Sequence, residues 1–332
     1  MCNFLITIQI PGIYTTIIRN LNKQRKFISA NITQILAEVE KSNDGTLSSK
    51  DFLKINGYYG LAVPSILGEA FCKLRGKDMT NPERWVSTSQ GIITGLFDDF
   101  FDEVKLSDEY LVRMINEPQK IVTRSSNEKL FIDFYLKVLS EASFPGLIID
   151  QFMSVYKDQK DSVEQENKEI TVDRIWEITQ NKGGDSVLFY RAGFNNTMEK
   201  GEREALFQLG ALMQLENDIF DLYKDWESKI NTLVTRAKKV IELRNKYIEQ
   251  MDLFIELSYE MNYPKKQIKR FLNLLMPVIN RGFVCLDQYK KLEELSNNSF
   301  SIESYSRKQL ICDMEKPMNI LSTIKYQIKN CY

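Results

Sequence analysis

Apolar residues recur every three or four positions along most of the chain, which is the spacing of one face of an α-helix. Hairpin signals are few, and glycine is scarce, with 15 residues in 332. We therefore predict about ten helices and essentially no strand, packed as an all-α, antiparallel bundle. The main predicted helices cover residues 15–41, 57–77, 81–103, 107–116, 126–157, 171–181, 185–194, 202–228, 232–262, 264–292 and 301–332.

Proline and glycine mark the starts and breaks of these helices. Asn81 is placed to cap a helix whose first turn holds Pro82. The sequence Phe144-Pro145-Gly146 predicts a kink, and Lys182-Gly183-Gly184 interrupts the helical pattern.

No linker rich in proline, glycine or serine divides the chain, so we expect a single domain despite its length. Residues 1–56 supply N-terminal helices, residues 57–260 a core that carries the motifs, and residues 261–332 C-terminal helices. The apolar N-terminus has no preceding basic residue and predicts a docked segment rather than a signal peptide. No run reaches the ~18 apolar residues that span a bilayer, so we expect no stable membrane insertion.

Two clusters of acidic residues lie inside apolar, helix-like stretches. Asn217, Asp221 and Asp225 recur every four residues, which advances about 40° per step around a helix. The second cluster contains Asp98, Asp99 and Asp102. Small or polar residues precede both clusters at matching helical offsets, namely Gly91 and Gly95 before the first and Gly210 and Gln214 before the second. These stripes predict either the floor of a cavity or a place where helices pack closely.

Composition excludes several classes of chemistry. The chain has no histidine, which removes Ser-His-Asp and Cys-His hydrolysis, His-ligated zinc and histidine general bases. A net charge of −1, from 44 basic and 45 acidic residues, argues against nucleic acid as a partner. The 5 cysteines are scattered and form no CxxC pair, which is typical of free thiols in a reducing cytoplasm.

Carboxylate and amide oxygens without histidine or cysteine suit Mg²⁺, which takes oxygen ligands and leaves coordination sites to substrate phosphates. Two such clusters across an apolar cavity would hold a phosphorylated head group at the mouth and a hydrocarbon tail below. The alternative for each cluster is a solvated helix face without function.

The two clusters also resemble known motifs. Asp98-Asp99-Phe100-Phe101-Asp102 resembles the DDxxD motif of class I isoprenoid synthases, the superfamily of terpene cyclases and prenyl diphosphate synthases. The segment NDIFDLYKD, from Asn217 to Asp225, resembles the second metal motif of terpene cyclases, (N/D)Dxx(S/T)xx(K/R)(D/E). It departs from that motif at Asp221, where serine or threonine is usual. The preceding GALMQLENDIFD also resembles the GxxxQxxDDxxD of prenyl diphosphate synthases.

This resemblance implies a helical bundle with a central active-site cavity and a Mg²⁺-dependent lyase that releases diphosphate from a linear prenyl diphosphate. It implies about three Mg²⁺ ions, with Mn²⁺ as an alternative. The implied metal ligands are Asp98, Asp99, Asp102, Asn217, Asp221 and Asp225. The implied diphosphate-contacting residues are Arg174, Lys182 and Lys224, and the implied substrate-binding residues are Phe97, Gly183, Arg191 and Gln214.

The reaction class has alternatives. Chain-elongating prenyl diphosphate synthases share an N-terminal GGKRxRP stretch and an arginine pair after the first motif, and this chain has neither. That favours cyclisation of one prenyl diphosphate over elongation or head-to-head coupling. A non-catalytic helical protein that binds a partner is the third reading, and a homodimer is open under each of them.

Overall fold

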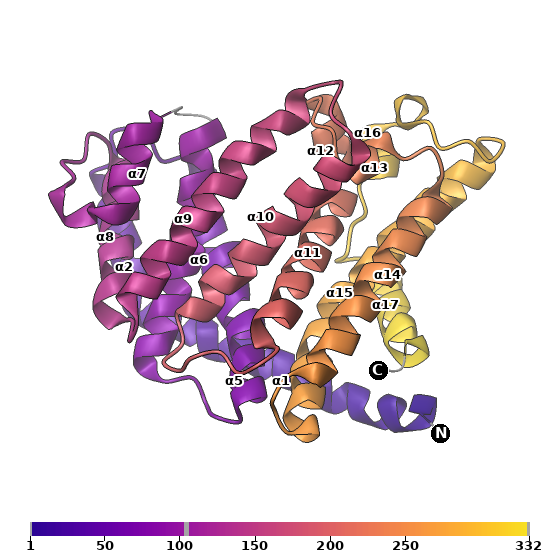
Figure 1. Ribbon diagram of the computed structural model, residues 1–332, viewed down its shortest axis with the longest axis horizontal. Coiled ribbons are helices and arrows are strands. Elements are labelled where there is room, and N and C mark those ends of the chain that lie inside the picture. Colours follow the sequence, from indigo (N-terminus) through magenta and orange to yellow (C-terminus); the bar gives the residue numbers. More distant parts are fainter. Residues whose placement is uncertain (1, 103–105, 331–332) are drawn as a thin grey trace. The chain divides into compact units, whose positions relative to one another are not determined.

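The computed structural model describes residues 2–102 and 106–330, and nearly all of them lie in helices or short turns, with no strand among them (Figure 1). The side chains of residues 2–8 and of Asp102 fall outside this description. The prediction of an all-α chain is therefore confirmed for the described residues.

The chain divides into two compact units, each built from separate segments. Unit 1 contains residues 1–11, 155–188 and 198–332, and unit 2 contains residues 12–154 and 189–197. Three helices contain a unit boundary: α1 (Cys2–Asn31), α9 (Pro145–Asp161) and α10 (Val172–Ala192). The expectation of a single domain stays a prediction.

Unit 2 holds the first acidic motif at the end of its long helix α6. Its elements, besides parts of α1, α9 and α10, are α2 (Thr33–Lys41), α3 (Ser49–Leu53), η1 (Lys54–Tyr59), α4 (Gly60–Ala62), η2 (Val63–Gly68), α5 (Glu69–Arg75), α6 (Asn81–Asp102), α7 (Asp108–Asn116), η3 (Pro118–Lys120) and α8 (Ser126–Glu141). The segments η1 and η2 are π-helical, so the predicted helix over residues 57–77 contains widened turns, and Pro64 lies in the second of them.

Unit 1 holds the second acidic motif, at the junction of α11 and α12. Its elements, besides parts of α1, α9 and α10, are η4 (Ser162–Glu166), α11 (Glu202–Phe220), α12 (Leu222–Glu227), α13 (Leu233–Arg236), α14 (Val240–Glu260), α15 (Lys265–Leu295), η5 (Ile302–Ser304), α16 (Arg307–Leu310) and α17 (Pro317–Lys329). Helix α11 packs against both α14 and α15, and α16 packs against α12.

The core of unit 2 is aromatic around Phe97. Its ring lies 4.8 Å from Phe152, 5.8 Å from Phe131 and 5.3 Å from Phe101, measured between ring centroids. Elsewhere in the unit, buried ion pairs join Arg75 to Glu83 at 2.7 Å and Arg84 to Glu69 at 2.6 Å. Paired charges of this kind satisfy the hydrogen-bonding groups that burial would otherwise leave without partners.

Several predicted helices are divided in the structure: residues 232–262 form α13 and α14, and residues 301–332 contain η5, α16 and α17. Residues 15–41 do not form one helix, because α1 starts at Cys2 and ends at Asn31, before α2 begins at Thr33. There the Asn31 side chain donates a hydrogen bond to the Phe27 carbonyl at 2.9 Å, and such a local side-chain bond competes with the helical pattern. Residues 126–157 form α8 and α9, because Ala142 is extended and Pro145 starts a new helix.

The start of α6 is capped by a different residue from the predicted Asn81. The backbone N–H of Glu83 donates to the Thr80 hydroxyl at 3.3 Å, and the Thr80 N–H donates back to the Glu83 carboxylate at 2.9 Å. This reciprocal pair is a capping box, so Thr80 is the cap and Asn81 is the first helical residue.

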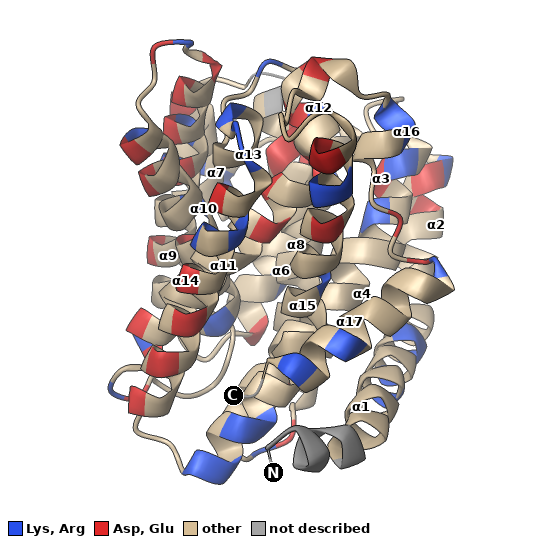
Figure 2. Cartoon of the chain, turned by 90° about the vertical axis from the view of Figure 1, so that its right-hand side faces the viewer, with Lys and Arg blue, Asp and Glu red and all other residues tan. Residues whose placement is uncertain are grey.

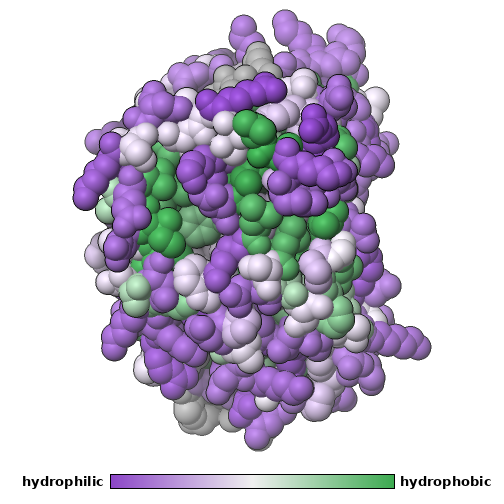
Figure 3. Space-filling model, turned by 90° about the vertical axis from the view of Figure 1, so that its left-hand side faces the viewer, coloured by the Kyte–Doolittle hydropathy of each residue, from purple (hydrophilic) through white to green (hydrophobic). Residues whose placement is uncertain are grey.

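The surface is mixed in charge and polarity. Figure 2 shows lysine and arginine interspersed with aspartate and glutamate, with acidic residues around α12. On the face drawn in Figure 3, apolar residues show between polar ones instead of forming one uninterrupted surface. Within residues 2–102 and 106–330, no helix combines the length and apolar character that a bilayer crossing requires.

Candidate active site

The second motif spans a short break between α11 and α12. Helix α11 ends at Phe220, and Asp221 adopts φ −89° and ψ 8° before α12 begins at Leu222. Four-residue hydrogen bonds continue through the break, because the Asp221 N–H donates to the Asn217 carbonyl at 2.8 Å and the Asp225 N–H donates to the Asp221 carbonyl at 2.9 Å. The motif therefore keeps a helical spacing although the predicted helix over 202–228 is interrupted.

Asp218 is the buried member of this motif. Its side chain accepts hydrogen bonds from the Gln214 amide at 2.8 Å and from the Thr179 hydroxyl of α10 at 3.4 Å. Burial raises the pKa of the Asp218 carboxyl to about 6, although Gln214 and Lys182 oppose this shift. Gln214, predicted to bind substrate, thus holds Asp218 in this structure.

Asp218, Asp221 and Asp225 interact electrostatically, and we call these three residues the α11–α12 acidic face. Burial, followed by the negative charges of Asp218 and Asp221, raises the pKa of Asp225 to about 7. Lys182 on α10 is a positive charge that acts on both Asp218 and Asp225. Three carboxyl groups therefore interact with two ammonium groups, those of Lys224 and Lys182, and a bound cation would relieve the repulsion that raises the pKa of Asp225.

Asn217 and Lys224 are the exposed members of the motif. The ammonium group of Lys224 lies 3.9 Å from an Asp221 carboxylate oxygen, and its side chain is 77% exposed. An exposed ion pair of this length contributes little to stability, so Lys224 is able to move toward an anionic ligand at small cost.

Lys182 is positioned by a close helix crossing in unit 1. A Cβ atom on Gly183 would overlap the Gly210 carbonyl and lie 2.7 Å from the Gln214 Cβ, and a Cβ on Gly210 would overlap the Gly183 carbonyl. A Cβ on Gly184 would overlap the ring of Phe207. The glycines permit α10 and α11 to touch through their backbones.

The prediction that Lys182-Gly183-Gly184 interrupts a helix is therefore wrong. Helix α10 runs without a break from Val172 to Ala192. The cost of two mid-helix glycines is offset by packing that no larger residue allows. The sequence left open whether the stripe at Gly210 lines a cavity or allows two helices to pack closely. In this structure it allows close packing.

The two predicted arginines have acidic or carbonyl partners. Arg174 lies 2.8 Å from Glu164, 3.0 Å from Glu177 and 3.2 Å from Asp161, and hydrogen bonds to Glu164 and Glu177 raise its pKa. In unit 2, Arg191 is 1% exposed and donates to the Asn196 carbonyl at 3.2 Å. Arg174 would have to exchange these carboxylates for phosphate oxygens to fulfil its predicted role.

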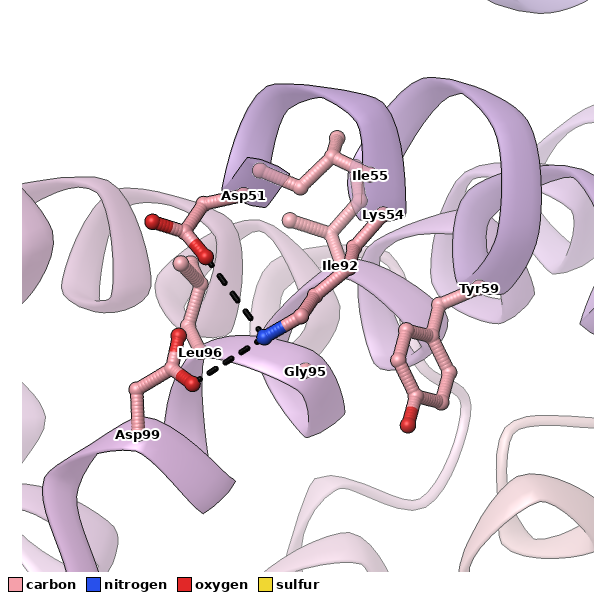
Figure 4. Close-up of a pocket in the computed structure, with 8 residues that line it drawn as sticks. All are labelled: Asp51, Lys54, Ile55, Tyr59, Ile92, Gly95, Leu96 and Asp99. Atoms are coloured by element: carbon pink, nitrogen blue, oxygen red, sulfur yellow. Dashed lines mark hydrogen bonds and ion pairs between the residues drawn. The ribbon is translucent and has the colours of Figure 1, made fainter. Parts of the chain in front are cut away.

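The first motif lies in unit 2, where its aspartates differ in environment. Asp98 is partly exposed, whereas Asp99 is 7% exposed and lies 3.2 Å from the Lys54 ammonium group. Figure 4 shows Lys54 between Asp99 and Asp51, the latter at 3.5 Å. Burial alone would lower the pKa of Lys54, but its contacts with these two carboxylates raise it. The predicted ligand Asp102 has a side chain outside the described residues.

The glycines of the first motif are also packing positions. A Cβ on Gly95 would lie 3.0 Å from the Tyr59 ring, and a Cβ on Gly91 would lie 2.5 Å from the Tyr59 carbonyl. This close approach seats η1 against α6, and Gly95 also lines a small pocket between these two elements (Figure 4). Phe97, predicted to bind substrate, is 2% exposed in the aromatic core.

The first motif belongs to unit 2 and the second to unit 1. Among the described side chains, no three acidic or cysteine groups converge closely enough to hold a metal ion alone. Mg²⁺ commonly takes one or two carboxylates, with water and phosphate oxygens completing its shell. The carboxylate and amide oxygens of the second motif, and the repulsion among the carboxylates of the acidic face, fit an ion of this kind.

Two residues of unit 1, one in the acidic face and one near it, did not enter the predicted site. The first is Asp218, whose signal was present because Gln214, Asp218, Asp221 and Asp225 follow the same-face spacing i, i+4, i+7, i+11. The second is Arg307, whose guanidinium group lies 5.8 Å from the Tyr223 ring centroid on α12. The packing of α16 on α12 brings Arg307 near the motif although the two are far apart in sequence.

A second group of carboxyls lies between α9 and α10 in unit 1. Asp158 is 5% exposed; burial, followed by the charge of Asp185 and a hydrogen bond between the two carboxyls, raises the pKa of Asp158 to about 8. In the unfolded chain the pKa of an aspartate is about 3.9. The folded state therefore holds a proton that the unfolded state releases, so this contribution to stability is full below about pH 4 and lost as pH rises through about 8.

We expect Asp158→Asn to stabilise the protein at high pH. An amide keeps a donor toward Asp185 and cannot ionise, so the free energy of unfolding should rise by about 1–3 kcal/mol at pH 8.5. Thermal unfolding of the parent and variant between pH 5 and pH 8.5 measures this, with the exposed Asp133→Asn as control. An unchanged pH dependence in the Asp158 variant would contradict the assignment.

Comparison with protein-family models, with curated proteins and with solved structures finds no match to this chain.

Proposed function

We propose that this protein is a Mg²⁺-dependent class I terpene synthase, a carbon–oxygen lyase that removes diphosphate from a linear prenyl diphosphate and cyclises the resulting allylic cation. The observation that carries the proposal is the α11–α12 acidic face, where burial and the charges of Asp218 and Asp221 raise the pKa of Asp225 although Lys224 and Lys182 oppose this shift. Such an arrangement favours a ligand that brings positive charge with it, as a metal–diphosphate complex does.

Within this proposal, the metal ligands are Asn217, Asp221 and Asp225 of the second motif and Asp98 and Asp102 of the first. The ions would neutralise the charge that develops on the departing diphosphate. Asp99 is assigned a positioning role instead, because its carboxylate is already paired with Lys54 at 3.2 Å. Asp218 is likewise a positioning residue, since its hydrogen bonds join the motif to α10.

Lys182 and Lys224 are proposed to contact diphosphate oxygens. Lys182 stands beside the buried carboxylates, and Lys224 is exposed next to Asp221. An ammonium group donates up to three hydrogen bonds and is a compact partner for a phosphate oxygen. Arg307 is a further cation, because its guanidinium group lies 5.8 Å from the ring centroid of Tyr223, the residue before Lys224.

Chain elongation is the second candidate, and Asp221 is the observation that favours it. Its carboxylate stands where cyclases usually have a hydroxyl, and the resulting GxxxQxxNDxxD sequence resembles that of elongating synthases. The lack of an arginine pair after Asp102 argues against a second diphosphate site. Cyclisation of one substrate therefore remains the stronger proposal.

The test is incubation of the full chain with C10 to C25 prenyl diphosphates and Mg²⁺, followed by mass spectrometry of the products. We expect a cyclic hydrocarbon or alcohol from a single substrate, and none when EDTA removes the metal. Products that form only after isopentenyl diphosphate is added would replace cyclisation with elongation. The absence of product in every combination would leave the non-catalytic, partner-binding reading.

A further inference from the structure

Helix α17 of unit 1 turns polar side chains toward the protein and apolar side chains toward solvent. Its buried residues are Thr323 and Gln327, which lie one helical turn apart. Met318, by contrast, is 67% exposed and Leu321 is 51% exposed. A surface helix of a protein in water usually has the opposite arrangement, with its apolar stripe against the core.

The buried polar side of α17 is incompletely paired. Gln327 is 0% exposed, and neither its amide nitrogen nor its carbonyl oxygen has a hydrogen-bond partner among the described residues. On α15, which packs against α17, the Asn280 side chain accepts a hydrogen bond from Asn330 at 3.0 Å, while its own amide nitrogen has no described partner. Buried polar groups without partners lower stability, so packing inside unit 1 does not explain why α17 faces this way.

Contacts of Tyr326 fix the rotation of α17 about its axis. The Tyr326 hydroxyl donates to the Asp287 carboxylate of α15 at 2.7 Å, and its ring stacks on Phe283 with the centroids 5.0 Å apart. The Arg244 guanidinium of α14 donates to the same hydroxyl at 3.3 Å. A rotation that buried Leu321 would break these contacts, so the apolar side chains stay outward.

The outward side of α17 also carries positive charge. Lys325 and Lys329 are exposed and follow Leu321 at intervals of four residues, which places all three on one side of the helix. No acidic residue occurs within α17, whose lysines are blue in Figure 2, and the nearest one in the sequence, Glu315, precedes the helix. We call the exposed residues of this side the outer face of α17: Met318, Ile320, Leu321, Lys325 and Lys329.

The charge of the outer face discriminates between its possible partners. A second copy of the chain, paired through the same face, would bring the lysines of both copies together, and like charges repel. An anionic lipid surface attracts these lysines instead. Their long side chains reach the lipid head groups while apolar neighbours enter the boundary with the acyl chains.

We propose that α17 is an interfacial anchor that lies on the surface of a bilayer containing anionic lipids. The apolar residues of the outer face enter the boundary between head groups and acyl chains, and Lys325 and Lys329 contact lipid phosphates. The helix lies along the bilayer and does not cross it. This proposal does not depend on the proposed reaction, because none of these residues belongs to either acidic motif.

The test is sedimentation of the full chain with vesicles of phosphatidylcholine alone and with vesicles in which about one third of the lipid is phosphatidylserine. We expect binding to the anionic vesicles that weakens as the salt concentration rises, and at least about tenfold weaker binding to the neutral vesicles. No binding to anionic vesicles would overturn the proposal, as would equal binding to both kinds.

Reversal of the lysine charges locates the binding surface. Lys325→Glu combined with Lys329→Glu should lower the affinity for anionic vesicles by about 20-fold or more, since each lysine at such a surface contributes roughly fivefold. The control, Lys168→Glu combined with Lys238→Glu, changes the net charge equally at exposed positions of unit 1 outside α17. It should bind within about threefold of the parent. Equal losses in both pairs would contradict the assignment to α17.

An apolar substitution tests the other half of the outer face. Leu321→Ser should weaken vesicle binding by about tenfold, whereas Ile241→Ser, at another exposed apolar position on α14, should not. Sedimentation equilibrium without lipid tests the alternative of a second copy. A dimer that Leu321→Ser dissociates would assign the face to self-association and overturn the proposal. Melting temperatures verify that each variant is folded.

Discussion

Gly210→Val is expected to lower the free energy of unfolding by about 3 kcal/mol or more, because the new side chain has no space. A Cβ on Gly210 would overlap the Gly183 carbonyl and lie 2.7 Å from the Gly184 Cα. Backbone atoms cannot move aside as a flexible side chain does, so α10 and α11 must separate. That separation exposes Asp218 and loosens its hydrogen bond from Thr179 of α10.

The measurement is denaturant unfolding of Gly210→Val and Gly183→Val beside a matched glycine control. Gly12→Ala in α1 is suitable, since a Cβ at Gly12 would meet no atom within 4 Å and alanine favours a helix by about 0.5–1 kcal/mol. We expect loss of stability in the first two variants and none in the control. A Gly210→Val protein as stable as the parent would mean that the α10–α11 crossing is looser than in this structure.

Asn217→Ala and Asp98→Ala are each expected to reduce diphosphate release by at least about 100-fold while leaving the fold intact. Asn217 is exposed and Asp98 is partly exposed, so neither substitution creates a buried cavity. Each removes one proposed metal-binding oxygen from a different unit. A loss of activity in both variants would support the assignment of both motifs to metal binding.

The control for this pair is Asp252→Asn, an exposed carboxylate on α14 of unit 1. It changes the net charge as Asp98→Ala does and lies outside both motifs, so its rate should stay within about twofold of the parent. Circular dichroism and melting temperatures verify that the inactive variants are folded. Full activity in either motif variant would remove that residue from the proposed site.

The all-helical character of the chain was predictable because apolar periodicity extends over whole helices. Breaks within helices were harder to predict, since a glycine in a helical pattern either interrupts the helix or allows close packing against another one. Gly183 and Gly184 looked like an interruption, yet they allow close packing against Gly210 and Phe207, residues distant in sequence. The cap at Thr80 was missed for a different reason, because Asn81 and Pro82 gave an equally good signal one residue later.

The two motifs of the candidate site could be predicted from the sequence, but the surroundings of their side chains could not. Sequence spacing placed Asp221 and Asp225 on one helical face, and the structure adds that Asp218 shares this face and is anchored to α10. The partners of Asp99 and Arg174 could not be predicted, because Lys54 and Glu164 come from other elements. The three-ion metal cluster, the substrate and the reaction stay predictions from the motifs.

The most direct test of the proposed function is the first chemical step, diphosphate release from one prenyl diphosphate in the absence of isopentenyl diphosphate. The release rate is measured across the C10 to C25 substrates while the Mg²⁺ concentration is varied. We expect saturable release from at least one substrate that depends on Mg²⁺ and is lost in Asn217→Ala. Metal-independent release, or no release from any substrate, would contradict the assignment as a class I terpene synthase.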